Sequence, residues 1–103
     1  MEYVRVNTDR AYEMYDRLPE GDKMALTRRI AKRREFIKKS PNLIKKRTFK
    51  HHPQDDYEYM FYHFDTFRHQ KDAAMVVGIL RQKDHMARVM LNRSKYEIWT
   101  RII

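Results

Sequence analysis

Twelve lysines and arginines lie between Lys23 and Lys50, where the single acid is Glu35. Their ammonium and guanidinium groups could neutralise phosphates, and each neutralised phosphate releases a condensed counterion. The flanking segments are almost balanced, with three bases and six acids in residues 1–22 and eight bases and seven acids in residues 51–103. Charge that is concentrated in this way attracts a polyanion more strongly than the same charge spread evenly. The pattern predicts a phosphate-bearing partner, either RNA or DNA.

The cations fall at positions that could face such a partner. In the helix that we expect to carry most of them, Arg28, Lys32 and Lys39 form a ridge away from the apolar positions. Arg29 and Arg33 lie beside the apolar stripe, where their stems can pack while the guanidinium groups reach outward. The predicted phosphate contacts are Arg28, Lys32, Lys38, Lys39, Lys45, Lys46, Arg47 and Lys50.

Aromatic side chains crowd the segment that follows. Residues 57–64 alternate as a strand does, and one face of a strand in a small sheet must be buried. Tyr57 and Tyr59, with His63, are therefore the candidates for the other face. Exposed rings can stack on unpaired bases. A cationic helix beside an aromatic strand suits single strands and loops better than a duplex groove. This combination therefore favours RNA slightly over DNA.

Residues 51–56, His-His-Pro-Gln-Asp-Asp, lie between these two features. Imidazole and carboxylate groups could bind a metal ion or carry out acid–base chemistry on a ribose 2′-hydroxyl. Their spacing matches no ligand pattern, so we expect a polar turn that extends the basic surface, with no metal site and no cofactor. If the protein were a ribonuclease, its candidate catalytic residues would be Lys46, Arg47, His51, His52 and Tyr96.

Several classes of protein are excluded by residue counts. Cysteine is absent, so there is no disulfide framework and no thiolate zinc site. Glycine occurs only at Gly21 and Gly78, which rules out a glycine-rich loop around a nucleotide phosphate. No stretch approaches the 18 apolar residues of a membrane span, and the first residues lack the apolar centre of a signal peptide. We expect a cytoplasmic protein.

The elements that must position these residues fit one domain over residues 1–103, since the chain is short and 42% apolar. Residues 3–6 suit a short strand. Asn7 or Thr8 could cap a first helix, which Pro19 and Gly21 would end, and Asp22 could cap the second. The basic helix should run from about residue 23 to 39, because Ser40-Pro41 stops it. The basic region, with its connector, thus covers residues 23–50.

The second half predicts antiparallel strands over residues 45–50, 57–64, 75–80 and 96–103, with turns between them. Residues 73–92 also show helical spacing, and a third helix is the alternative. Strands are favoured because a β-branched run with the internal Gly78 costs a helix more than a strand. The expected class is α+β: a short strand, two helices, then an antiparallel meander of three to four strands.

Three functional hypotheses follow. The first is a small basic nucleic-acid-binding protein, and its size and charge suit a phage or viral protein that regulates or interferes with host machinery. The second rests on the order strand, two helices, antiparallel sheet, which is similar to that of the RelE-like bacterial toxins. That likeness of architecture, with no motif matched, implies a metal-independent endoribonuclease. The third is a protein-interaction module that docks an acidic protein surface. None involves a membrane.

Overall fold

The computed structural model describes residues 1–50, 54, 56–83 and 86–101. The predicted α+β class is confirmed, with three α-helices and a five-stranded antiparallel sheet in the described part of the chain. The elements follow in the order β1 (Glu2–Val4), α1 (Thr8–Asp16), α2 (Glu20–Lys39), the 3-10 turn η1 (Pro41–Leu43), β2 (Lys46–Lys50), β3 (Glu58–Phe67), α3 (Gln70–Gln82), β4 (Ala87–Asn92) and β5 (Lys95–Thr100).

The strand order in the sheet is β1-β4-β5-β3-β2. β3 and β4 both pair antiparallel with β5, so they run parallel to each other, with α3 as the crossover between them. The sheet therefore departs from the expected meander at one place, because β5 lies between the two strands that α3 connects. This arrangement is a split β-α-β unit, a common supersecondary motif.

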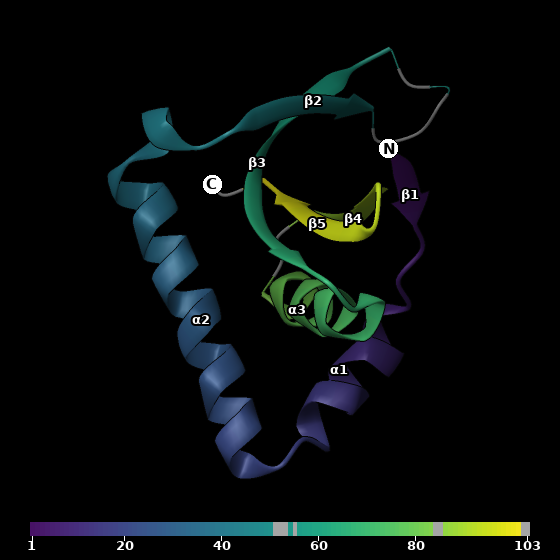
Figure 1. Cartoon of the computed structure of the whole chain (residues 1–103). Coiled ribbons are helices and arrows are strands. Elements are labelled where there is room, and N and C mark those ends of the chain that lie inside the picture. Colours follow the sequence, from purple (N-terminus) through teal and green to yellow (C-terminus); the bar gives the residue numbers. More distant parts are fainter. Residues whose placement is uncertain (51–53, 55, 84–85, 102–103) are drawn as a thin grey trace.

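The strand predicted over residues 75–80 is wrong, since these residues belong to α3. The helical alternative holds for residues 73–82 and is wrong for residues 87–92, which form β4. α3 is buried from Met75 through Leu80, between the sheet and α1 (Figure 1). A helix that is covered on most sides is apolar on most sides, so its sequence resembles that of a buried strand.

Gly78 allows the close approach of α1 and α3. A Cβ built on Gly78 would lie 2.9 Å from the Cβ of Ala11 and 3.1 Å from the backbone nitrogen of Tyr12. The glycine that argued against a helix in the sequence is therefore needed for helix packing.

Asn7 caps α1, as predicted, by accepting a hydrogen bond from the Arg10 backbone nitrogen. α2 begins earlier than expected, at Glu20 after Pro19, so Asp22 lies inside its first turn rather than at its cap. Its end at Lys39 is confirmed, and Ser40 follows as the C-cap.

A bulge in β3 anchors α2. The β3–β5 register shifts between His63 and Asp65, so Phe64 is an extra residue on β3. Arg33 Nε donates to the Phe64 carbonyl oxygen at 2.6 Å, and Arg29 donates to both carboxylate oxygens of Asp65 at 2.6 and 2.9 Å. Arg33 is half-buried, whereas Arg29 is exposed, although its guanidinium carbon lies 4.1 Å from the Phe67 ring centroid. Their bonds fix which side of α2 faces the sheet.

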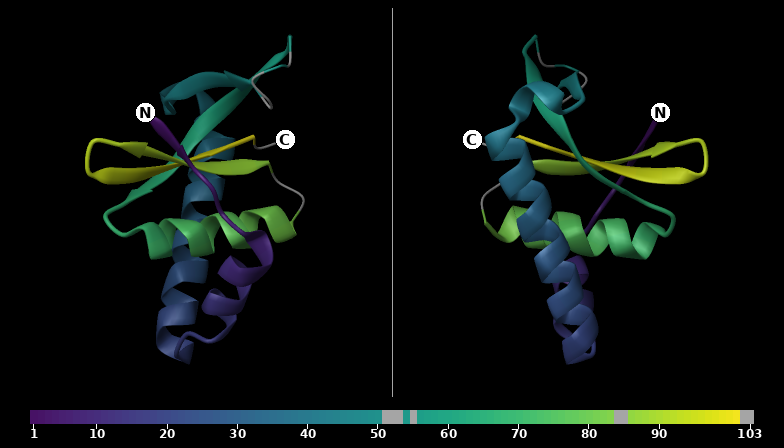
Figure 2. Two further views of the ribbon diagram at one scale, coloured as in Figure 1. Left: turned by 90° about the vertical axis from the view of Figure 1, so that its right-hand side faces the viewer. Right: turned by 60° about the vertical axis from the view of Figure 1, so that its left-hand side comes forward.

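The sheet curls, and its two faces differ. One face carries the main core, which joins Ile30 and Ile37 of α2 to α3 and the sheet. The other face, turned away from α3, lies inside the arch that β3 and β2 make over β4 and β5 (Figures 1 and 2). We call it the concave face. Phe49 on β2 reaches Trp99 on β5 across it, with ring centroids 5.7 Å apart.

We predict that Gly78→Val lowers the free energy of unfolding by roughly 1–3 kcal/mol, because its side chain overpacks the α1–α3 contact. Gly21→Ala is the matched control, since nothing lies within 4 Å of its added Cβ. It should leave stability unchanged or raise it by up to about 1 kcal/mol. Urea unfolding followed by circular dichroism measures both, and equal losses would contradict the packing role of Gly78.

We predict that Arg29→Ala costs about 1–2 kcal/mol of unfolding free energy, because it leaves the Asp65 carboxylate with fewer partners. The Arg29 side chain is 49% exposed, which keeps the loss modest. Arg28→Ala, on the outer side of the same helix, should change stability by less than about 0.5 kcal/mol. If the two variants unfold at the same urea concentration, the bulge does not anchor α2.

Candidate nucleic-acid interface

The outer side of α2 presents a ridge of cations to solvent. Arg28, Lys32 and Lys39 are exposed and lie opposite the buried Ile30 and Ile37. Helical periodicity places them there, and the anchoring of α2 on β3 keeps that side outward. Lys38, on the flank of the helix, is also exposed.

The basic surface continues through η1 onto β2, which is the edge strand of the sheet. α2, η1 and β2 follow one another along the left and upper border of the molecule in Figure 1. Lys45, Lys46, Arg47 and Lys50 are all exposed on this stretch. The predicted phosphate contacts thus form one continuous border, which we call the basic border.

The register of β2 divides its cations between the two sheet faces. Lys46 pairs with Tyr62, whose ring packs on the main core, and its Nζ lies 5.7 Å from that ring centroid. Arg47 pairs with Phe61, which belongs to the cluster on the concave face. A polyanion that followed the basic border would meet cations on both sides of β2.

Few of these cations are neutralised by the protein's own acids. Within the described residues, the only ion pair that involves a predicted contact joins Lys39 to Glu35, at 2.7 Å. Both side chains are largely exposed, and such pairs contribute little to stability. The hydrogen bond from Lys39 lowers the pKa of Glu35, so this carboxyl stays charged at neutral pH. The basic border therefore keeps most of its positive charge available.

The concave face holds an arginine that the sequence did not reveal. The Arg88 guanidinium carbon lies 4.7 Å from the Phe61 ring centroid and 5.2 Å from that of Phe49. Its Nη1 donates to the Lys50 carbonyl oxygen at 3.3 Å, which ties β4 to β2. Burial lowers the pKa of Arg88, although a guanidinium remains charged at any physiological pH. Only the strand register brings Arg88 beside these rings.

The predicted stacking residues lie at this face and its rim. Tyr59 pairs with Phe49, is partly buried, and has the Arg101 guanidinium carbon 4.6 Å from its ring centroid. Tyr57, just before β3, is 76% exposed. Phe61 and Trp99 are almost fully buried, so they belong to the core of this face. Tyr57 is the ring that offers a free surface.

His63 has a structural environment. Its Nε2 lies 2.7 Å from the Thr66 hydroxyl oxygen, and its ring meets Trp99 edge-on with centroids 5.4 Å apart. Burial is the main cause that lowers the pKa of His63, and the nearby Glu97 opposes the shift. A partly buried imidazole held in this way acts as a neutral packing group at neutral pH.

The described candidate ribonuclease residues, Lys46, Arg47 and Tyr96, do not come together. Lys46 and Arg47 point to opposite sides of β2. Tyr96 pairs with Phe67 and packs on the main core, on the sheet face away from Arg47. His51 and His52 lie outside the described residues. The described members of the set therefore form no single catalytic cluster.

Two other kinds of site are absent from the described residues. No group of three or more His, Asp or Glu side chains there could hold a metal ion. No helix among these residues has the length and apolarity needed to cross a membrane. Comparisons with protein-family models, with curated proteins and with solved structures find no match.

We predict that the unfolding free energy falls as the pH drops below about 6.5, because His63 contributes to the pH dependence. Its pKa is lower in the folded protein than in the unfolded chain, so the unfolded chain takes up the proton first. The contribution of His63 to stability is fully present above the pKa that this imidazole has in the unfolded chain. It is lost as the pH falls toward the lower pKa of His63 in the folded protein. His63→Gln, which cannot titrate, should flatten the curve between pH 7 and 5.

The exposed His69 at the start of α3 supplies the control. His69→Gln should keep the slope of the unmodified protein when urea unfolding is measured at several pH values. A slope that His63→Gln leaves unchanged would contradict the role given to burial of this imidazole.

Proposed function

We propose that this protein binds RNA, mainly through phosphates that contact the basic border. The observation that carries the proposal is the exposure of the cations on α2, η1 and β2, together with the scarcity of ion pairs among them in the described chain. Unpaired cations gathered on one border create the local potential that a polyanion seeks. Arg29 and Arg33 do not belong to this set, because their guanidinium groups bind the β3 bulge.

The dimensions of the basic border suit a polymer better than a single phosphate. Arg28 and Lys39 are eleven residues apart, which is about 16 Å along a helix. The five residues of β2 add about 17 Å of strand. An extended chain with regularly spaced phosphates can contact both parts, whereas a mononucleotide can contact only one.

Tyr57 supports a preference for single-stranded RNA. It directly precedes Glu58, which pairs with Lys50 at the end of β2. An exposed ring beside a cation can stack on a base while the cation contacts the neighbouring phosphate. Paired bases offer no such face, because they are stacked on one another within the duplex.

A titration against salt concentration tests the proposal. For a single-stranded RNA of about 15 nucleotides, four to eight phosphate contacts should give a slope of log K against log salt of roughly −3 to −6. Fluorescence anisotropy with a labelled oligonucleotide measures it, and duplex RNA of the same length should bind more weakly. An affinity that does not change with salt would remove the proposal.

We predict that replacing Lys45, Lys46 and Arg47 together by Ala weakens RNA binding more than tenfold at moderate salt. Three phosphate contacts are lost, while the three side chains are exposed and contribute little to the core. The matched control replaces Arg68, Lys71 and Lys95, which are also exposed cations but lie outside the basic border. The control removes the same charge and should weaken binding by less than about threefold.

If the two triple variants lose the same RNA affinity, net charge alone determines binding and the position of the cations does not. Circular dichroism and urea unfolding confirm that both variants are folded. If the purified protein binds an acidic protein, and not RNA, after nuclease treatment, the basic border serves protein docking instead.

A further inference from the structure

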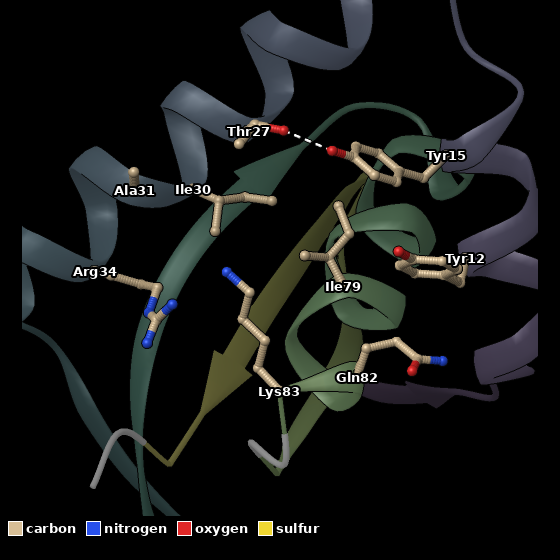
Figure 3. Close-up of a pocket in the computed structure, with 9 residues that line it drawn as sticks. All are labelled: Tyr12, Tyr15, Thr27, Ile30, Ala31, Arg34, Ile79, Gln82 and Lys83. Carbon is tan, nitrogen blue, oxygen red and sulfur yellow. Dashed lines mark hydrogen bonds between the residues drawn. The ribbon is translucent and has the colours of Figure 1, made fainter.

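The two flanks of α2, between its buried side and its cationic ridge, have different surroundings. One flank faces α1 and α3 across a pocket of about 420 Å³, which Figure 3 shows with the described side chains that line it. Phe36 is not among these lining residues. Its spacing from Arg29 and Arg33, at i−7 and i−3, places it on the other flank, toward the β3 bulge.

Phe36 presents an aromatic ring to solvent within the basic border. The residue is 43% exposed, whereas Ile37, which follows it, is 2% exposed. Its neighbours on the helix surface at i−4 and i+3 are Lys32 and Lys39, and both are exposed. An apolar ring thus lies directly beside the cationic ridge, with much of its surface outside the core.

The ring has a fixed neighbour on the side toward the sheet. The Arg33 guanidinium carbon lies 5.7 Å from the Phe36 ring centroid. Arg33 is itself held by the bond from its Nε to the Phe64 carbonyl oxygen at 2.6 Å. Because Arg33 is fixed, it limits the positions that the Phe36 ring can take. A side chain that is already restricted loses less conformational entropy when it binds a ligand.

The two lysines beside the ring can contact phosphates. In the part of the chain that the structure describes, Lys32 forms no ion pair. Lys39 pairs with Glu35 at 2.7 Å, but both side chains are largely exposed, so a phosphate can compete for the ammonium group. A ring with cations beside it is the arrangement by which proteins hold single strands, since the base stacks while the cations follow the backbone.

We propose that Phe36 is the stacking site for one unpaired RNA base, whose adjoining phosphates contact Lys32 and Lys39. This inference rests on the proposed function, because it assigns a base contact to the same basic border. Duplex RNA does not offer a free base face to the ring, since its bases are stacked on one another. The ring therefore favours single strands at the α2 end of the border.

The test compares a 15-nucleotide oligouridine with an abasic oligonucleotide of the same length and charge, using the full chain and one salt concentration. Phe36→Leu keeps an apolar side chain and removes the ring. It should weaken oligouridine binding at least about fivefold, which corresponds to about 1 kcal/mol, and abasic binding by less than about twofold. Phe36→Tyr keeps the ring and should retain the oligouridine affinity within about twofold. Fluorescence anisotropy measures all of these affinities.

Met24→Leu is the matched control. Met24 is an apolar residue of the same helix and is 47% exposed, but it has no ring. This variant should leave both affinities unchanged. A second readout is the set of Phe36 ring proton resonances, which are assigned from their loss in Phe36→Leu. They should move upfield when oligouridine is added, because of the ring current of a stacked base, and stay in place with the abasic oligonucleotide.

The outcomes separate this inference from the proposed function. If the unmodified protein binds neither oligonucleotide, the proposed function fails and the stacking site fails with it. If the protein binds both and Phe36→Leu keeps the full oligouridine affinity, only the stacking site is overturned. Equal losses for the two oligonucleotides also overturn it, provided that circular dichroism shows a folded variant. If Phe36→Leu weakens binding to phosphatidylserine vesicles and not to oligouridine, the ring serves a lipid surface and the proposal is wrong.

Discussion

The attachment of α2 to the β3 bulge by Arg29 and Arg33 is the interaction on which the rest of the structure depends. Where β3 has its extra residue, Arg33 donates to the Phe64 carbonyl oxygen and Arg29 donates to the Asp65 carboxylate. Such bulges redirect side chains at defined positions. Here the bulge sets the rotation of α2 about its axis. That rotation decides which cations of α2 face solvent and which of its residues face α1 and α3.

The same residue type serves different purposes in this chain, and its neighbours decide which. Arg29 and Arg33 hold elements together, and Arg88 fills space among rings on the concave face. Lys46, Arg47 and Lys50 lie on the edge strand, where charged side chains also discourage pairing with a second sheet. A role in phosphate binding and a role in keeping the edge free are compatible, because both require these cations to stay exposed.

The sequence allowed the local elements to be predicted where a chemical signal marks them. The cap at Asn7, the end of α2 before Ser40 and the strand rich in aromatics all rest on such signals. α3 was predicted only as the alternative to strands, because its buried residues form a continuous apolar run that also suits a strand. The exposed positions of Arg28, Lys32 and Lys39 followed from helical spacing. Arg88 and the pocket could not be predicted, since each depends on residues that only strand register or helix packing brings together.

The central place of β5 has a consequence for how the protein reaches its fold. β5 is synthesised after the other four strands, yet it lies between β3 and β4 and pairs with both. Without β5 (Lys95–Thr100), the β2–β3 hairpin and the β1–β4 pair have no strand to join them. Because an isolated pair of strands is at best marginally stable in water, each half of the sheet depends on β5, and the sheet as a whole depends on contacts that are distant in the sequence.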